Sequence, residues 1–168
     1  MTFPEFDKVY NIMKKSFPPD EHRPHHEQKA LLSVPEYLIR TLDVDGDIVG
    51  FIALWDFDDF TFIEHFALGE RYRNRGLGGK FLRDTIHKIN KPVCLEAEPP
   101  TDELTVRRIG FYNRCGFHLN GYHYIQPSIS EGRSPVELKI MTYPHAVDES
   151  GFEEIRRVLY DKVYHVNM

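Results

Sequence analysis

Three glycines within four positions, Gly76, Gly78 and Gly79, stand where a strand is expected to run into a helix. Glycine destabilises a helix by about 1 kcal/mol relative to alanine, so another requirement must place these residues at a helix start. The first backbone N–H groups of a helix lack internal partners and carry partial positive charge, and they therefore bind phosphate oxygens. Because glycine has no Cβ and adopts positive φ, this turn favours a diphosphate held by backbone N–H groups.

The residues around the glycines narrow the choice of diphosphate. Arg73, Arg75 and Lys80 supply full positive charges beside the turn. A Walker loop requires Ser or Thr after its Gly-Lys pair, and here Phe81 follows Lys80. The dinucleotide pattern requires a third glycine, and Phe81 occupies that position too. Both a nucleotide triphosphatase and an NAD-binding protein are therefore disfavoured.

Length and composition favour one domain, residues 1–168, with a single core, because 41% of the 168 residues are hydrophobic and 13% are aromatic. A net charge of −5, from 21 basic and 26 acidic residues, provides no broad basic field for nucleic acid. No apolar run approaches the roughly 20 residues of a membrane span, and the N-terminus lacks a signal-peptide pattern. We expect a cytoplasmic protein without nucleic-acid or membrane partners.

Six strands are predicted from apolar runs bounded by turn residues. Asp45 and Gly46 are favoured residues for a tight hairpin turn, so the first two strands should be antiparallel. The third strand, the glycine turn, a helix and the fourth strand form a βαβ unit, whose two strands should be parallel. The predicted strands are residues 37–42, 48–57, 60–68, 93–98, 117–125 and 136–143.

Helices are predicted before, between and after these strands. Thr101 is the expected N-cap of one helix, and Ser150 with Glu153 is expected to form the capping box of the last. The order of elements indicates an α/β (α+β) fold with a mixed, partly antiparallel sheet flanked by helices. The predicted helical segments are residues 6–17, 28–32, 78–89, 101–114 and 150–163.

Two motifs give the chain a resemblance to a known family. Residues 73–78 match the pattern Arg-x-x-Gly-x-Gly, and residues 111–117, FYNRCGF, look like a helix end followed by Cys-Gly-Phe and a strand. With both motifs the chain resembles the GNAT superfamily of acyl-CoA-dependent N-acetyltransferases. The resemblance covers about residues 38–143 and leaves residues 144–168 as a C-terminal helical extension. It implies a sheet that is splayed at its central parallel pair, with acetyl-CoA in the split.

The resemblance also implies which residues contact acetyl-CoA. The pantetheine arm would pair with the backbone of residues 66–68 like an added strand, and the pyrophosphate would lie on residues 75–79. No metal is expected, and His22, His25 and His26 are expected to lie in a solvated loop. The expected cofactor-binding residues are Phe66, Ala67, Leu68, Arg73, Asn74, Arg75, Gly76, Leu77, Gly78, Gly79 and Lys80.

Acetyl transfer to a primary amine by direct attack, through a tetrahedral intermediate, requires a base because the free amine is protonated at neutral pH. Glu64 is the first candidate, and burial would raise its pKa. The alternative for Glu64 is a structural ion pair or a polar strand position. Glu98 is the second candidate, and sequence does not rank it against Glu96 or against a water chain. His65 is expected to point away from Glu64 and to serve packing.

Tyr112 is the expected donor of a proton to the departing thiolate, because the resemblance implies a tyrosine at this position. Its alternative role is packing with its hydroxyl hydrogen-bonded. Thr105 stands where many members of the family have an asparagine that contacts the cofactor, so that contact is not carried over.

The acceptor, a small-molecule or peptide amine, is not readable from the sequence. A polyamine, an aminoglycoside and a lysine side chain all remain open, as does modification of a peptide N-terminus within a larger complex. A homodimer is also possible. The competing hypothesis is a non-catalytic acyl-CoA-binding regulatory module, which would keep the glycine turn without needing Glu64 or Tyr112.

Overall fold

The computed structural model describes residues 1–167. The chain forms two compact units, one from Met1 to Val93 and the other from Cys94 onward. Within residues 1–167, every helix is too short or too polar to cross a membrane.

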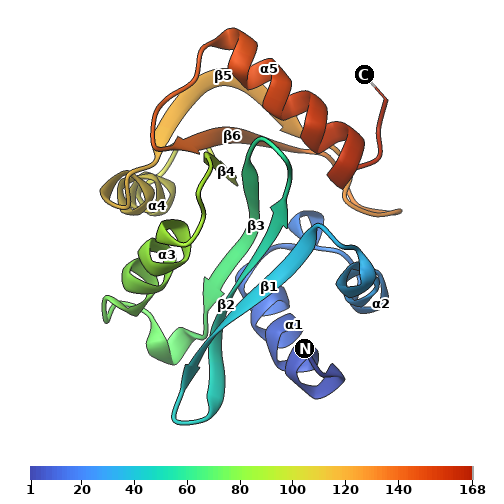
Figure 1. Cartoon of the computed structure of the whole chain (residues 1–168), viewed down its shortest axis with the longest axis vertical. Helices are drawn as coiled ribbons and strands as arrows, with labels where there is room; N and C mark the ends of the chain where they lie inside the picture. Colours follow the sequence, from blue (N-terminus) through green and yellow to red (C-terminus); the bar gives the residue numbers. More distant parts are fainter. Residues whose placement is uncertain (168) are drawn as a thin grey trace. The chain divides into compact units, whose positions relative to one another are not determined.

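The first unit contains three α-helices and three antiparallel strands in the order β1-β2-β3 (Figure 1). The first helix begins with a capping box between Thr2 and Glu5 and ends before Pro18. Its buried residues, Phe6, Val9 and Met13, give it an apolar face, and the helix packs on β2 and β3. The elements are α1 (Phe3–Ser16), α2 (His25–Ala30), β1 (Tyr37–Val44), β2 (Asp47–Asp56), β3 (Thr61–Leu68) and α3 (Leu77–His87).

The predicted hairpin turn between β1 and β2 is confirmed. Asp45 has a φ of 51° and Gly46 a φ of 84°, as the favoured two-residue turn requires at both positions.

A β-bulge changes the faces of β3. Ala53 of β2 pairs with His65 and Leu54 pairs with Ile63, so Glu64 is an extra residue on β3. The strict alternation of a strand is interrupted there. Both Glu64 and His65 contact the segment 21–23, and the expectation that they point to opposite faces is therefore wrong.

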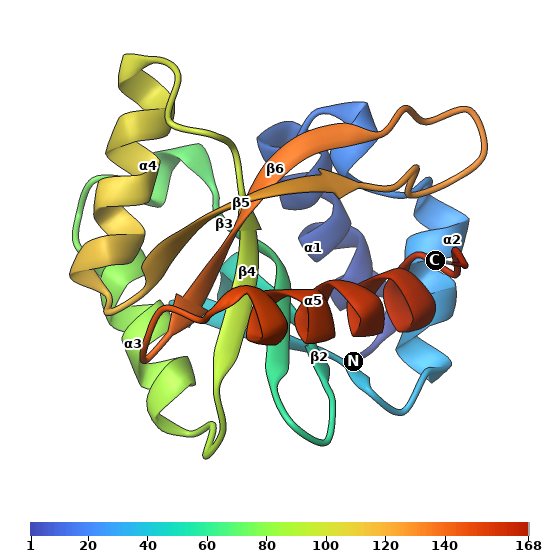
Figure 2. The ribbon, with the colours of Figure 1, turned by 90° about the horizontal axis from the view of Figure 1, so that it is seen from above.

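The second unit contains strands in the order β4-β6-β5, with β5 and β6 antiparallel, and the helices α4 and α5. Phe152 of α5 stacks on Tyr122 of β5 at 5.0 Å between ring centroids, and Figure 2 shows α5 running beside this strand. The elements are β4 (Val93–Ala97), α4 (Glu103–Arg114), β5 (His118–Gln126), β6 (Val136–Tyr143), α5 (Glu149–Val158) and a π-helical turn η4 (Leu159–Val163).

Both predicted N-caps in this unit are wrong, each by one or two residues. Asp102, rather than Thr101, caps α4, because its carboxylate accepts from the Thr105 N–H at 2.8 Å. Asp148, rather than Ser150, caps α5 by accepting from the Gly151 N–H at 2.8 Å. The carboxylate of Glu153, expected in the capping box, pairs with an arginine one turn later instead.

Candidate active site

The glycine turn forms the first turn of α3. Gly76 is the N-cap residue, with a φ of 77° that an L side chain rarely adopts. It offers no side chain, and no side-chain hydrogen bond caps this helix start. The Lys80 N–H is the first to bond within the helix, to the Gly76 carbonyl at 3.2 Å. The N–H groups of Leu77, Gly78 and Gly79 therefore lie ahead of the intrahelical ladder.

The protein's own packing does not require a glycine at position 78. A Cβ there would lie 3.5 Å from the nearest atom, in the ring of Phe66, which is ordinary van der Waals contact. A Cβ on Gly79 would lie 3.0 Å from the flexible end of Arg83. Gly78 and Gly79 both weaken the helix, although alanine would fit at position 78 and nearly fit at position 79. This arrangement fits a ligand whose oxygens approach the backbone at this turn.

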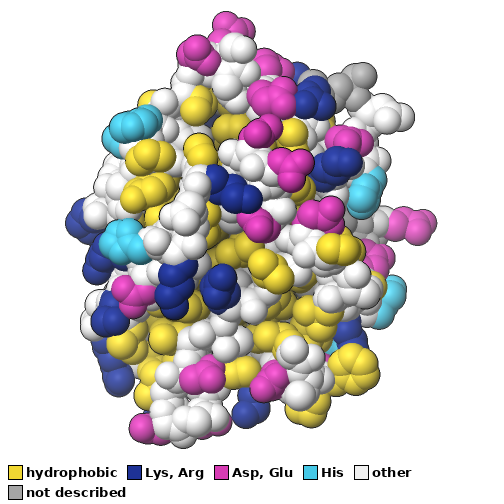
Figure 3. All heavy atoms as spheres, in the orientation of Figure 1, with side chains coloured by type: hydrophobic (Ala, Val, Ile, Leu, Met, Phe, Trp, Pro, Cys, Tyr) yellow, Lys and Arg dark blue, Asp and Glu magenta, His cyan; other side chains and the backbone are white. Residues whose placement is uncertain are grey.

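Exposed basic residues surround the turn, at Arg73, Arg75 and Lys80. In Figure 3, lysine and arginine side chains gather on the left of the face, the side on which Figure 1 draws α3. The Arg73 Nε donates to the Leu68 carbonyl at 3.0 Å, which ties this arginine to the end of β3. Asn74 has a φ of 62°, so the backbone bends sharply just before the glycines. The other expected cofactor residues, 66–68, pair with β2 along one edge of β3.

Glu64 lies in a buried ion pair with Arg23. The Arg23 Nη2 lies 3.0 Å from Oε2 of Glu64, and the two side chains are 7% and 2% exposed. Oε1 accepts from the Arg23 Nη1 at 3.1 Å and from the Trp55 Nε1 at 3.0 Å. Burial alone would raise the pKa of Glu64, but the Arg23 guanidinium and these hydrogen bonds hold the pKa below its ordinary value. The expectation of a raised pKa is wrong.

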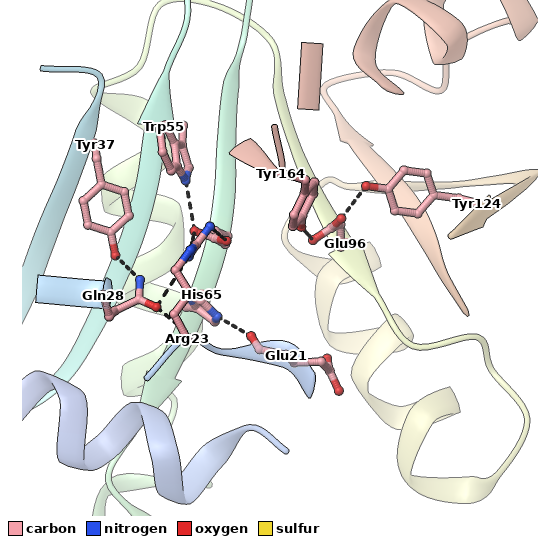
Figure 4. A network of polar contacts seen from close by, with 10 residues as sticks. Glu21, Arg23, Gln28, Tyr37, Trp55, His65, Glu96, Tyr124 and Tyr164 are labelled. Carbon is pink, nitrogen blue, oxygen red and sulfur yellow. Dashed lines mark hydrogen bonds and ion pairs between the residues drawn. The ribbon is translucent and has the colours of Figure 1, made fainter. Parts of the chain in front are cut away.

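The ion pair belongs to a larger polar network, drawn in Figure 4. Gln28 accepts from the Arg23 Nη1 at 3.4 Å and donates to the Tyr37 hydroxyl at 2.9 Å. The His65 Nε2 lies 2.6 Å from the Glu21 carbonyl. Burial lowers the pKa of His65 below its ordinary value, so this imidazole is neutral and donates to that carbonyl. The segment 21–28 therefore supplies three residues, Glu21, Arg23 and Gln28, to this polar network.

The prediction that three histidines lie in a solvated loop is wrong in two respects. His22 is buried, and its Nδ1 lies 3.0 Å from the Pro18 carbonyl. His25 and His26 are exposed as expected, but they lie in the first turn of α2 and not in a loop. No cluster of three potential metal ligands occurs in the described part of the chain.

In the second unit, Glu96 of β4 accepts hydrogen bonds from two tyrosines. The Tyr164 hydroxyl donates to Oε1 at 2.6 Å, and the Tyr124 hydroxyl donates to Oε2 (Figure 4). Glu98, just after β4, is half-buried and lies 3.6 Å from the Arg108 guanidinium. Of the two glutamates that the sequence did not rank, Glu96 is the one whose carboxylate is fixed at both oxygens.

Tyr112 lies in the last turn of α4, with its ring 5.9 Å from that of Phe117. Burial raises the pKa of Tyr112 to about 12, so its hydroxyl stays protonated across the neutral range. The hydroxyl makes no hydrogen bond within residues 1–167, in contrast with the alternative role considered for it. The Thr105 hydroxyl accepts a hydrogen bond from the Asp102 N–H in the capping box of α4.

Sequence reasoning missed Arg23, Trp55, Tyr124 and Tyr164 as partners of the candidate carboxylates. Arg23 lies in a polar segment that has the composition of a solvated loop, and its partner is 41 residues away. Tyr160, in the last predicted helix, and Tyr164, just after its predicted end, are four residues apart and were a weak signal that an aromatic face was directed inward.

The comparisons with known proteins agree with this geometry. The family model described as Acetyltransferase (GNAT) family matches residues 6–117. YjbC of Bacillus subtilis (strain 168), which is named as an acetyltransferase, is 26% identical over 158 residues, covering 92% of this chain and 80% of YjbC.

Solved structures of acetyltransferases share the fold of this chain. A GNAT-family acetyltransferase from Bacteroides thetaiotaomicron superposes with a TM-score of 0.91 at 32% identity, covering 98% of this chain and 94% of that one. A GNAT acetyltransferase from Elizabethkingia anophelis, solved with acetyl-CoA bound, has a TM-score of 0.52 at 18% identity, covering 69% of this chain and 81% of that one. The predicted mixed α/β fold class and the resemblance to this family are confirmed.

Proposed function

The chain belongs to the acetyltransferase (GNAT) family, and we propose that it transfers an acetyl group from acetyl-CoA to a primary amine. Family membership makes it an acyltransferase. The single observation that carries the cofactor is the first turn of α3, where Gly78 has room for a Cβ and the N–H groups of residues 77–79 precede the helical ladder. These N–H groups, with Arg73, Arg75 and Lys80, would hold the diphosphate of coenzyme A.

Acetyl-CoA supplies, when bound, the thioester carbonyl that the amine attacks to form a tetrahedral intermediate. The backbone of residues 66–68 would hold the pantetheine arm. Tyr112 would give its phenolic proton to the departing thiolate. The pKa of about 12 keeps the phenol protonated at neutral pH, so Tyr112 has a proton to give.

The base is proposed to come from β4 rather than β3. Protonating Glu64 would break a buried ion pair, and the lowered pKa of Glu64 opposes protonation at neutral pH. The structural alternative for Glu64 is thereby favoured. Glu96 and Glu98 remain the candidates, on a strand and at its end, and a water chain could connect either to the amine.

The acceptor amines to be tested are polyamines, aminoglycosides and peptide amines. The competing function is an acyl-CoA-binding module without turnover. Such a module and an enzyme would both bind the cofactor at the glycine turn, so an activity measurement is needed to distinguish them.

An amine panel separates the two functions. Purified protein is incubated with acetyl-CoA and each of a set of primary amines, and the released thiol is measured against a reaction without amine. We expect amine-dependent thiol release with at least one class. If calorimetry detects acetyl-CoA binding while no amine in a broad panel releases thiol, the regulatory module is the better description.

A further inference from the structure

Helix α5 is followed by a π-helical turn, η4, and the next residue, Tyr164, donates a hydrogen bond to Glu96. The family model matches residues 6–117 only, so it gives no role to α5 and the π-helical turn that follows it. Helix α5 and the turn bury Phe152, Ile155, Leu159 and Val163. These four residues lie at helical spacing and form an ordinary apolar stripe.

Tyr164 would not lie on this stripe if the helix were regular. In an α-helix, a residue five positions after Leu159 is rotated by about 140° from it, since 3.6 residues make one turn. Here the Tyr164 N–H bonds the Leu159 carbonyl at 3.1 Å, five residues back, which is the hydrogen bond of a π turn. The wider turn brings Tyr164 back toward the face of Leu159, and its side chain is buried with 7% exposed.

The two hydrogen bonds on Glu96 fix the carboxylate from two elements. Tyr164 reaches Oε1 from the end of η4, and Tyr124 reaches Oε2 from β5. The turn itself is fastened to β5, because the Tyr160 hydroxyl donates to the Ile125 carbonyl at 2.5 Å. Hydrogen bonds that involve an ionised partner are stronger than neutral ones, so the pair of phenols holds the ionised carboxylate in one orientation.

We propose that Tyr164 is a positioning residue for the acceptor side of the reaction, which holds Glu96 as the carboxylate that takes a proton from the acceptor amine. The inference rests on the proposed function. The step is a single proton transfer: an ammonium N–H bond breaks, an O–H bond forms on Glu96, and the neutral amine keeps the electron pair with which it attacks. Glu96 then returns the proton to solvent. The C-terminal segment is thus part of the catalytic apparatus and not only a cover for the sheet.

Other ionisable groups of the second unit face Glu96 and could contribute to its titration. These are Cys94 on the same strand, Tyr124 on β5, and Tyr160 and Tyr164 at the end of the chain. Burial, followed by the charge of Glu96, raises the pKa of both Cys94 and Tyr124 well above their ordinary values. Neither group changes charge between pH 5 and 8, so neither contributes to the acid side of a pH profile.

The test compares Tyr164→Phe with Tyr160→Phe, two variants that each lose one hydrogen-bonded hydroxyl from the same turn and keep the ring. Only the first hydroxyl bonds Glu96. For Tyr164→Phe we expect kcat to fall about tenfold and the acid limb of kcat/KM for the amine to move up by about one pH unit, because the ionised carboxylate loses a hydrogen bond. The KM for acetyl-CoA should not change. Tyr160→Phe should lower the melting temperature but leave the acid limb in place.

A second measurement does not depend on activity. The titration of Glu96 is followed by NMR on protein with ¹³C-labelled glutamate carboxyls, and Glu96→Gln identifies the resonance. The midpoint should rise in Tyr164→Phe and stay unchanged in Tyr160→Phe. An unchanged midpoint and acid limb in Tyr164→Phe, with only a lower melting temperature, would overturn the proposal. Failure of every amine to react would instead overturn the proposed function, and the NMR titration would still decide whether Tyr164 controls Glu96.

Discussion

The buried ion pair of Arg23 and Glu64 should affect stability more than an exposed ion pair of the same kind. Replacing Arg23 by Met leaves a carboxylate that is 2% exposed without its cation. We expect Arg23→Met to lower the free energy of unfolding by about 3 to 5 kcal/mol in urea denaturation. Arg107→Met, which removes an exposed pair with Glu103, is the matched control and should change little. Equal losses in the two variants would contradict a buried ion pair.

The same ion pair gives a pH dependence with a definite sign. The pKa of Glu64 is lowered in the folded protein, so its ionisation stabilises the fold above the unfolded value of about 4.3. That contribution is lost as the pH falls through the folded pKa. The difference in unfolding free energy between wild type and Glu64→Gln should therefore be largest near neutral pH and shrink below about pH 4. A difference that grew on acidification would mean that the folded pKa is raised.

Tyr112 is the residue on which the proposed acid step depends. We expect Tyr112→Phe to lower kcat about 100-fold, because proton transfer by a positioned group contributes at least that factor, with little change in the KM for acetyl-CoA. Because the pKa of Tyr112 is raised to about 12, wild-type kcat should show no loss from its ionisation below pH 10. Tyr122→Phe, whose hydroxyl faces the Val147 carbonyl at 3.5 Å, is the control and should retain full activity. An unchanged kcat in Tyr112→Phe would assign this tyrosine to packing.

At the scale of elements, the first turn of α3 should show opposite effects on stability and on binding. Gly78→Ala should raise the free energy of unfolding by about 0.5 to 1 kcal/mol, because alanine is the better helix former and its Cβ has room. The same Cβ should weaken coenzyme A binding at least tenfold in calorimetry. Gly110→Ala in α4, another glycine within a helix, should raise stability without changing binding. A Gly78→Ala protein that bound coenzyme A as tightly as wild type would contradict the diphosphate site.

The elements themselves were largely predictable because their signals are local. Apolar periodicity gave all six strands and the main helices, and β6 has the predicted bounds. The errors occur where two local signals compete or where a distant partner decides. Asp102 and Thr101 are both good caps, and the structure uses the one that can form a reciprocal bond with Thr105. The bulge at Glu64 and the π turn before Tyr164 add a residue to a regular repeat, and no periodic pattern predicts such an addition.

At the scale of the whole molecule, the candidate site was only partly predictable for the same reason. The glycine turn is contiguous in sequence, so its chemistry could be read directly. The carboxylates differ because their behaviour depends on partners far along the chain: Arg23 lies 41 residues from Glu64, and Tyr164 lies 68 residues from Glu96. Arg23 binds Glu64 in an ion pair, which opposes a role of Glu64 as the base. Two tyrosines hold the carboxylate of Glu96, which is the reason why we propose Glu96 for that role.

The protein has a net charge of −5, which does not attract an anionic cofactor. A polyanionic cofactor gains nothing from the mean charge of such a chain, so its affinity must come from local groups at the start of α3. Coenzyme A at 100 times its Kd should stabilise the fold by about 2.7 kcal/mol in thermal denaturation. Pantetheine, which lacks the diphosphate, should give almost no shift at the same concentration, and Gly78→Ala should lose most of the shift that coenzyme A produces. Equal shifts with pantetheine and coenzyme A would place the affinity in the pantetheine arm and refute the role of the glycine turn.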